Sequence, residues 1–266
     1  MQATLGTSRL PDERRDAMRE LALEFQRLAG SNLLGLSAFG GWLCGDPFFA
    51  QRPASCVAVL ARVDLGLLDR LAEAGPRYGR LRLRAPLIMT PGYIADSLDV
   101  FPLEFLEIQQ LHRTLLGADH FAGLQFERDH VRLQAERELK TQLIGLRQGL
   151  LAAGGRRSLL APVCLEETIR SIRVLRGALL LAGEPPAEHA ADVAARAERC
   201  CEVALPTLRR IIAGVGEITL DDFSRLYSEI DRLAQHVNGR GAASNPDPGA
   251  GLSAAETGRY NKSLRL

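Results

Sequence analysis

The chain has 266 residues, of which 46% are hydrophobic and 24% charged, with a formal net charge of +1. These values are typical of a globular protein with a buried core, and the near-neutral balance argues against nucleic-acid or anionic-membrane partners. Five cysteines without a Cys-x-x-Cys pair indicate reduced thiols rather than a disulfide framework. Because no apolar segment suits a secretory signal or a membrane span, we expect a cytoplasmic protein without a membrane partner.

The first half of the chain alternates helix-like and strand-like patterns. Apolar residues recur at helical spacing from Met18 to Leu28, whereas Arg80 to Ala85 alternates like a half-buried strand. Phe101–Ile108 favours a strand, although a helical start is also compatible with it. The predicted elements are helices over 11–30, 64–75 and 90–98 and strands over 33–39, 55–61, 80–89 and 101–108. This alternation predicts an α/β domain with a small mixed sheet over residues 1–125.

Residues 126–238 are predicted to be helical throughout. Leucines from Leu139 to Leu150 form one apolar stripe, and Thr219 and Asp222 resemble a capping box at the start of the last helix. The predicted helices cover 127–153, 159–181, 187–203 with a continuation after 206, and 219–237. We expect them to pack as an antiparallel bundle, which makes the whole protein α+β. Residues 239–266 lack a periodic apolar face and are predicted to be a disordered tail.

A glycine-rich loop, FGGWLCGDP, follows the first predicted strand. Glycines let backbone N–H groups approach phosphate oxygens because no Cβ stands in the way. The loop has neither the Gly-Lys-Ser/Thr of a P-loop nor the G-x-G-x-x-G of a dinucleotide-binding fold. Two interpretations stay open: Gly40, Gly41 and Gly45 hold a phosphate-bearing ligand, or they form a tight turn after the strand.

The layout around this loop resembles the nucleotidyltransferase superfamily of the polymerase-β type, in its small bacterial form with a C-terminal helical domain. In that family a strand leads into a glycine loop, and the next strand carries two metal-binding acids. Gly40, Gly41, Gly45 and the predicted strand 55–61 match this arrangement. The segments LRAPLIMT and LQAERELKTQLIGLRQG also look like bacterial nucleotidyltransferase-like proteins. The resemblance covers residues 20–235 and implies a nucleotidyltransferase-like N-terminal domain.

The positions that match the metal ligands of the family hold no carboxylate. Nucleotidyl transfer uses Mg²⁺, which prefers carboxylate oxygens, and the two acids alternate along one strand so that both face the same side. Here these degenerate metal positions are Ser55 and Val57, and Arg82 and Arg84 stand where the third acid of the family lies. We therefore expect no metal site and no cofactor, with Mg²⁺ bound only if other acids take over.

Three acids are candidates for such a replacement: Asp46 after the loop, and Glu104 and Glu107 in the predicted strand 101–108. The alternative is that Asp46 caps the helix after the loop and that the glutamates are solvated or paired with arginines. Arg82 and Arg84 are expected to point toward the loop and to bind a phosphate or nucleotide without a metal. Their alternative is a solvent-facing position or pairing with the two glutamates.

Three hypotheses for the function follow. The first is a degenerate nucleotidyltransferase, a pseudoenzyme that binds a nucleotide or another phosphate-bearing ligand, or regulates, without metal-dependent transfer. The second is an active nucleotidyltransferase that uses relocated acids to move a nucleoside monophosphate from a triphosphate to a small molecule or protein. The third is a structural protein whose helical bundle binds a protein partner.

Overall fold

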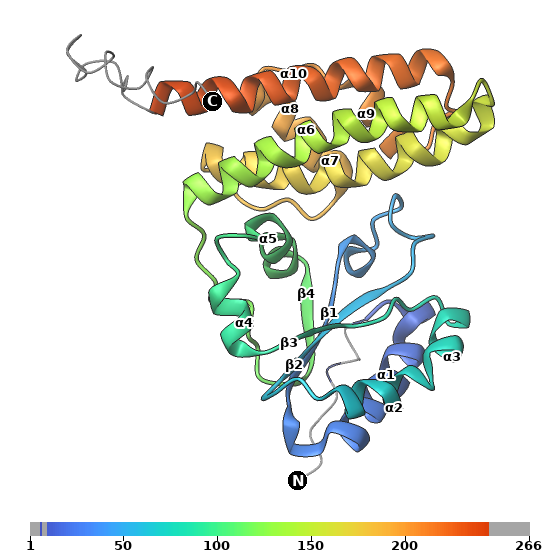
Figure 1. The fold of residues 1–266 in the computed structure, drawn as a ribbon, viewed down its shortest axis with the longest axis vertical. Coiled ribbons are helices and arrows are strands. Elements are labelled where there is room, and N and C mark those ends of the chain that lie inside the picture. The colour runs from blue at the N-terminus through green and yellow to red at the C-terminus, as the bar shows by residue number, and fades with distance from the viewer. Residues whose placement is uncertain (1–5, 7–9, 245–266) are drawn as a thin grey trace, which may run out of the picture.

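A computed structural model describes residue 6 and residues 10–244 of the chain. It is an α+β protein in which a small mixed sheet with its helices is followed by a group of longer helices, which lie above the sheet in Figure 1. Over the described residues, no helix combines the length and the apolar character that crossing a membrane requires.

The described elements, in chain order, are α1 (Asp12–Ala29), η2 (Gly30–Asn32), β1 (Leu33–Phe39), η3 (Gly41–Cys44), β2 (Ser55–Leu60), α2 (Leu65–Ala72), α3 (Gly75–Arg80), β3 (Leu87–Met89), α4 (Pro91–Asp96), α5 (Pro102–Gln110), β4 (His112–Gly117), α6 (Arg128–Ala153), η4 (Arg157–Leu159), α7 (Leu160–Ala182), α8 (Ala190–Cys201), α9 (Pro206–Ile212) and α10 (Leu220–Ser244).

The sheet has the strand order β3-β2-β1-β4, with β1 antiparallel to β2 and β4 and with β2 parallel to β3. The central strands β1 and β2 are buried, which explains their nearly continuous apolar sequences. Successive side chains point to opposite faces of a strand. Accordingly, Val57 and Val59 pack in one cluster with Phe105 of α5, while Cys56 and Ala58 belong to the cluster that contains α1.

The segment Arg80–Ala85, which its alternation predicts to be a strand, is not one. Arg80 ends α3, and the regular strand β3 is confined to Leu87–Met89. Between them, Arg82 has a φ of 57°, a left-handed conformation that no strand accommodates. Leu83 forms an isolated bridge with Ala54 rather than a ladder.

The helix predicted to start after Asp64 is confirmed as α2, but it ends at Ala72. Gly75 begins α3 and does not end a helix.

The segment predicted as the last strand, Phe101–Ile108, is the helix α5, which begins with Pro102 at its first position. The last strand is β4, immediately after it. In Figure 1, α5 lies between the sheet and the long helices, and α5 contacts both α6 and α7. Leu103 packs in the cluster that reaches the long helices, whereas Phe105 and Ile108 pack against the sheet. Burial on two sides removes the one-sided apolar stripe by which a helix is recognised.

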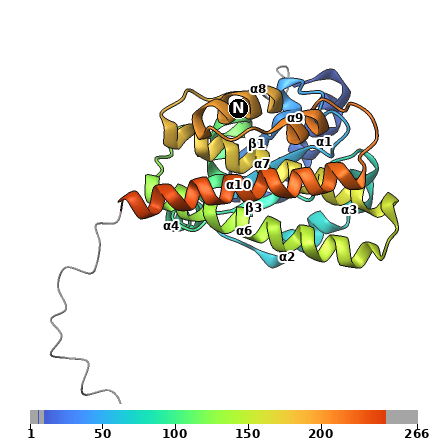
Figure 2. The ribbon, with the colours of Figure 1, turned by 90° about the horizontal axis from the view of Figure 1, so that it is seen from above.

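The long helices form the predicted bundle. α6 packs against α7 and α10, and α7 packs against α8 (Figure 2). Gly154 and Gly183 end α6 and α7 with φ values of 52° and 75°, a conformation that favours glycine. α10 continues to Ser244, so the part of the predicted tail from Gly239 to Ser244 is helical, and residues 245–266 lie outside the described residues.

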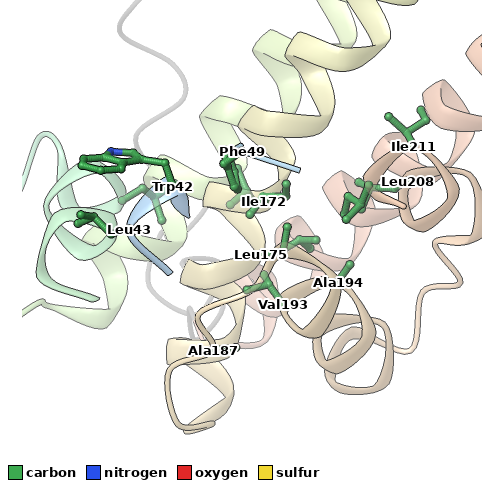
Figure 3. Packing of buried hydrophobic residues seen from close by; sticks show 14 of the residues in the cluster. Trp42, Leu43, Phe49, Ile172, Leu175, Ala187, Val193, Ala194, Leu208 and Ile211 are labelled. Carbon is green, nitrogen blue, oxygen red and sulfur yellow. The ribbon is translucent and has the colours of Figure 1, made fainter. Parts of the chain in front are cut away.

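One apolar cluster runs from α1 through the glycine loop into the bundle. It contains Trp42, Leu43 and Phe49 from the loop region and Ile172 and Leu175 from α7 (Figure 3). The division at residues 125 and 126 into separate domains therefore stays a prediction, because the two halves share this core.

The predicted capping box at α10 is confirmed. The Asp222 carboxylate accepts the N–H of Thr219 at 2.7 Å, and the Thr219 hydroxyl accepts the N–H of Asp222 at 3.2 Å. Arg210 is a further partner of Asp222, at 2.5 Å. Burial opposes the charge on Asp222, but the hydrogen bonds from Thr219 and Arg210 outweigh it and lower the pKa of this carboxyl.

We predict that Asp222→Ala lowers the free energy of unfolding by about 1 kcal/mol in urea denaturation at neutral pH. The matched control Asp221→Ala removes a pair with Arg225 in which both side chains are 68% exposed, so it should cost less than about 0.5 kcal/mol. The pKa of Asp222 is lower in the folded protein than in the unfolded chain. Its contribution to the free energy of unfolding is therefore complete above the unfolded pKa, about pH 4, and is lost as the pH falls through the folded pKa. Equal stability of the two variants at neutral pH would contradict this role.

Candidate functional site

A cavity of about 300 Å³ lies where the glycine loop, the sheet, α5 and α7 meet. Its lining joins most of the residues that the sequence singled out, although they are far apart along the chain. The residues that carry the argument are Gly40, Gly41, Ser55, Arg84, Glu104 and Glu107, together with Arg52 and Arg173. Gly45, Asp46, Val57 and Arg82 do not line it.

The glycines of the loop each have a conformational reason. Gly40 has a φ of 104° and Gly45 a φ of 68°, both in the region that favours glycine. A Cβ on Gly41 would overlap the ring of Phe49. The N–H of Gly40 already donates to the carbonyl of Leu111 at 2.8 Å. The turn interpretation thus explains all three glycines, and only Gly40 and Gly41 are placed to contact a ligand in the cavity.

Of the two degenerate metal positions, Ser55 lines the cavity and Val57 does not. Val57 is completely buried in the cluster with Phe105 and Ile108, and it has no atom that could bind a metal. Within the described part of the chain, no group of three or more His, Cys, Asp or Glu side chains is arranged to hold a metal ion. The absence of a bound metal stays a prediction.

Burial disfavours the thiolate form of the cysteine at the cavity wall. Cys56 lines the cavity but is fully buried, and burial raises the pKa of its thiol to about 12. The nearby Cys44 has its thiol pKa raised to about 11, mainly by burial and also by Glu188. Because the thiolate is the reactive form, both side chains pack as apolar groups.

Glu104 and Glu107 both reach the cavity, and one arginine of the bundle holds them. The Nε of Arg173 donates to Glu107 at 2.8 Å, and its Nη1 donates to Glu104 at 3.2 Å. Burial opposes the charge on Arg173, but Glu107 and Glu104 outweigh burial and raise the pKa of the guanidinium. The interpretation that the glutamates pair with arginines therefore describes the site, with Arg173 in place of Arg82 and Arg84.

Gln134 of α6 completes this cluster. Its amide Nε2 donates to Glu104 at 2.6 Å, and its Oε1 accepts the N–H of Leu103 at 2.7 Å, at the first turn of α5. Gln134 is only 3% exposed. Its amide is therefore shielded from solvent, and these two hydrogen bonds satisfy it in place of water. Neither Arg173 nor Gln134 could be identified from the sequence, because both act on a helix that the sequence favours as a strand.

Asp46 has a structural position away from the cavity. Its carboxylate is 3% exposed and accepts the N–H of Phe48 at 2.9 Å and the N–H of Ala190 at 2.6 Å. Ala190 is the first residue of α8, so Asp46 satisfies a free donor at the start of a helix in the bundle. The expectation that Asp46 caps a helix directly after the loop is wrong, because turns and then β2 follow the loop. Asp46 instead serves the start of α8, far along the chain, and it does not line the cavity.

The expectation that Arg82 and Arg84 point to the same side is wrong, because the segment that carries them is not a strand. Arg82 lies on the left-handed turn, and its Nη1 donates to Gln51 at 3.2 Å. Arg84 lines the cavity, and its guanidinium has no hydrogen bond or ion pair with any other residue in the described part of the chain. Arg52, also in the lining, pairs with Glu166 at 3.3 Å. Arg84 is therefore the cation at this cavity that is left for a ligand.

Comparison of the chain with models of known protein families and with curated proteins gives no match. The resemblance to nucleotidyltransferases is thus a prediction that rests on the residues alone.

We predict that Asp46→Ala lowers the free energy of unfolding by about 1–3 kcal/mol, because it leaves the buried N–H of Ala190 without an acceptor. Urea denaturation measures this loss. The control Asp96→Ala, at an exposed position on α4, should change stability by less than about 0.5 kcal/mol. If Asp46→Ala were as stable as the wild type, the hydrogen bond between Asp46 and α8 would contribute nothing to the free energy of unfolding, and the prediction would be wrong.

Proposed function

We propose that the chain is a binding module that holds a nucleotide or another phosphate-bearing anion in the cavity beside the glycine loop, without metal-dependent transfer. The observation that carries this proposal is the distribution of charge in the cavity. Arg173 pairs with both Glu104 and Glu107, whereas Arg84 lines the same cavity without a protein partner in the described residues. An anion supplies the partner that Arg84 lacks.

Phosphate fits this position for a chemical reason. A guanidinium is planar and permanently charged, and it can donate two parallel hydrogen bonds to two oxygens of a phosphate. The volume of about 300 Å³ lies at the lower end of the range for small-molecule sites. The cavity is also bounded by Phe39 and Trp42, but the indole Nε1 of Trp42 already donates to the carbonyl of Phe39 at 2.8 Å. Recognition of the ligand is therefore assigned to its phosphate oxygens.

An active enzyme with relocated acids is less well supported. Glu104 and Glu107 do line the cavity, as relocated metal ligands would have to. However, both carboxylates accept hydrogen bonds from Arg173, and a Mg²⁺ ion would have to displace this guanidinium or tolerate its charge at close range. We therefore assign the two glutamates to the junction between α5 and α7.

The proposal predicts that ATP and pyrophosphate bind to the protein in EDTA, as measured by isothermal titration calorimetry, and that added salt weakens the binding. Arg84→Ala should weaken it by about tenfold or more, because a charge-assisted hydrogen bond is lost. Arg82→Ala is the matched control, since Arg82 is exposed, lies two positions away and does not line the cavity. Its affinity should equal that of the wild type.

Two results would overturn the proposal. Equal binding by Arg84→Ala and the wild type would remove the residue on which recognition depends. Binding that appears only with Mg²⁺, together with turnover of the triphosphate, would support the active enzyme instead.

A further inference from the structure

A second cavity, of about 380 Å³, lies between α1, α2, α3 and the edge strand β3. In Figure 1, α1, α2 and α3 lie together beside the sheet, below the long helices. Its walls are almost entirely apolar, with Leu21 and Phe25 from α1, Leu68 and Leu71 from α2, and Ile88 from β3. Glu104, Glu107 and Arg173 do not line it, so it is distinct from the phosphate cavity.

Of the described residues that line the second cavity, Arg84 alone carries a charge. Tyr78 is the other polar side chain of the wall, and its hydroxyl already donates to Glu24. The guanidinium of Arg84 has no hydrogen bond or ion pair with the rest of the described chain. The second cavity thus combines an apolar interior with one cation that has no protein partner.

The wall on the side of α2 and α3 is made of small, exposed residues, Ala72, Gly75 and Gly79. The neighbouring apolar side chains Leu68 and Ile88 are only half-buried. Protein interiors are normally packed to crystal-like density, and apolar walls that face water cost free energy. An apolar ligand would remove this cost by covering Leu68 and Ile88.

We propose that this second cavity binds a small amphipathic anion, an unbranched aliphatic carboxylate. The chain of the ligand lies against the half-buried Leu68, Leu71 and Ile88, and its carboxylate pairs with Arg84. Binding sites of this kind are mostly apolar, with a few polar groups that fix the orientation of the ligand. Charge complementarity selects the carboxylate over neutral or cationic molecules of the same length. The two cavities share Arg84 and Ala85, so one guanidinium cannot pair with a ligand in each cavity at the same time. The inference does not require phosphate binding, because the apolar wall formed by α1, α2 and α3 belongs to the second cavity alone.

The test compares decanoate, decanol and decyltrimethylammonium by isothermal titration calorimetry with the full chain. Decanoate should bind, and the other two should bind about tenfold more weakly or not at all, because each lacks the anion that pairs with Arg84. Arg84→Gln should reduce the preference for decanoate over decanol to within about twofold. Binding of the cation as tightly as decanoate, or no binding of decanoate to the wild type, would overturn the proposal.

Two variants locate the ligand. Gly79→Phe and Ala72→Phe place a ring at the wall of the second cavity, and each should weaken decanoate binding by about tenfold or more. The control Gly92→Phe adds the same ring at a helical glycine of α4 with no atom within 4 Å of its Cβ, and it should bind decanoate like the wild type. Neither Gly79 nor Ala72 lines the phosphate cavity, so ATP binding reports separately on that site.

Wild-type affinity for decanoate in both Gly79→Phe and Ala72→Phe would overturn the proposal. So would light scattering that shows a dimer disrupted by Gly79→Phe while decanoate fails to bind, because a second copy of the chain would then cover the second cavity.

Discussion

The contact of Arg173 with Glu104 and Glu107 determines what the site can do. Arg173 belongs to α7 of the bundle, and both glutamates belong to α5 beside the sheet. On a helix, residues three positions apart lie on the same face, so one guanidinium reaches both carboxylates. The charges are partly withdrawn from water, with side-chain exposures of 34% for Arg173 and 15% for Glu107. Removal of Arg173 would leave both carboxylates without their cation.

The position of α5 depends on the same junction. Gln134 of α6 accepts the N–H of Leu103 and donates to Glu104, so the N-terminal turn of α5 is tied to the bundle by hydrogen bonds as well as by charge. A Cβ on Gly177 of α7 would collide with Leu103, which shows how closely α5 and α7 approach. Asp46 adds an independent connection between the loop and α8. Together these contacts fix the walls of the cavity beside the glycine loop and leave Arg84 as the cation of its lining that has no partner in the described residues.

Local patterns made part of this structure predictable from the sequence. β1 and β2 are short apolar runs between turn residues, Asp64 and Thr90 accept N–H groups at the starts of α2 and α4, and Thr219 with Asp222 caps α10. These features depend on neighbours along the chain. A small mixed sheet followed by a helical bundle was predictable in outline, but β4 is missed because the sequence pattern assigns the last strand to 101–108 in its place.

The remainder depends on partners that are distant in sequence. α5 is buried on two sides, so its apolar residues do not form one stripe, and a strand is favoured in its place. That assignment would put Glu104 and Glu107 on opposite faces, whereas the helix puts them together. The alternation of Arg80–Ala85 imitates a strand, but a left-handed residue at Arg82 turns the chain and separates Arg82 from Arg84. Arg173 has no local signal, because its role exists only once α5 packs against α7.

A double-mutant cycle between Arg173→Met and Glu107→Gln tests the central claim most directly. The free energy of unfolding is measured in urea for the wild type, both single variants and the double variant. If the guanidinium holds the carboxylates as described, the two substitutions are coupled by about 1–2 kcal/mol, and the double variant is more stable than the sum of the single losses predicts. Additive losses, with a coupling below about 0.3 kcal/mol, would contradict the claim that Arg173 holds the glutamates of the site.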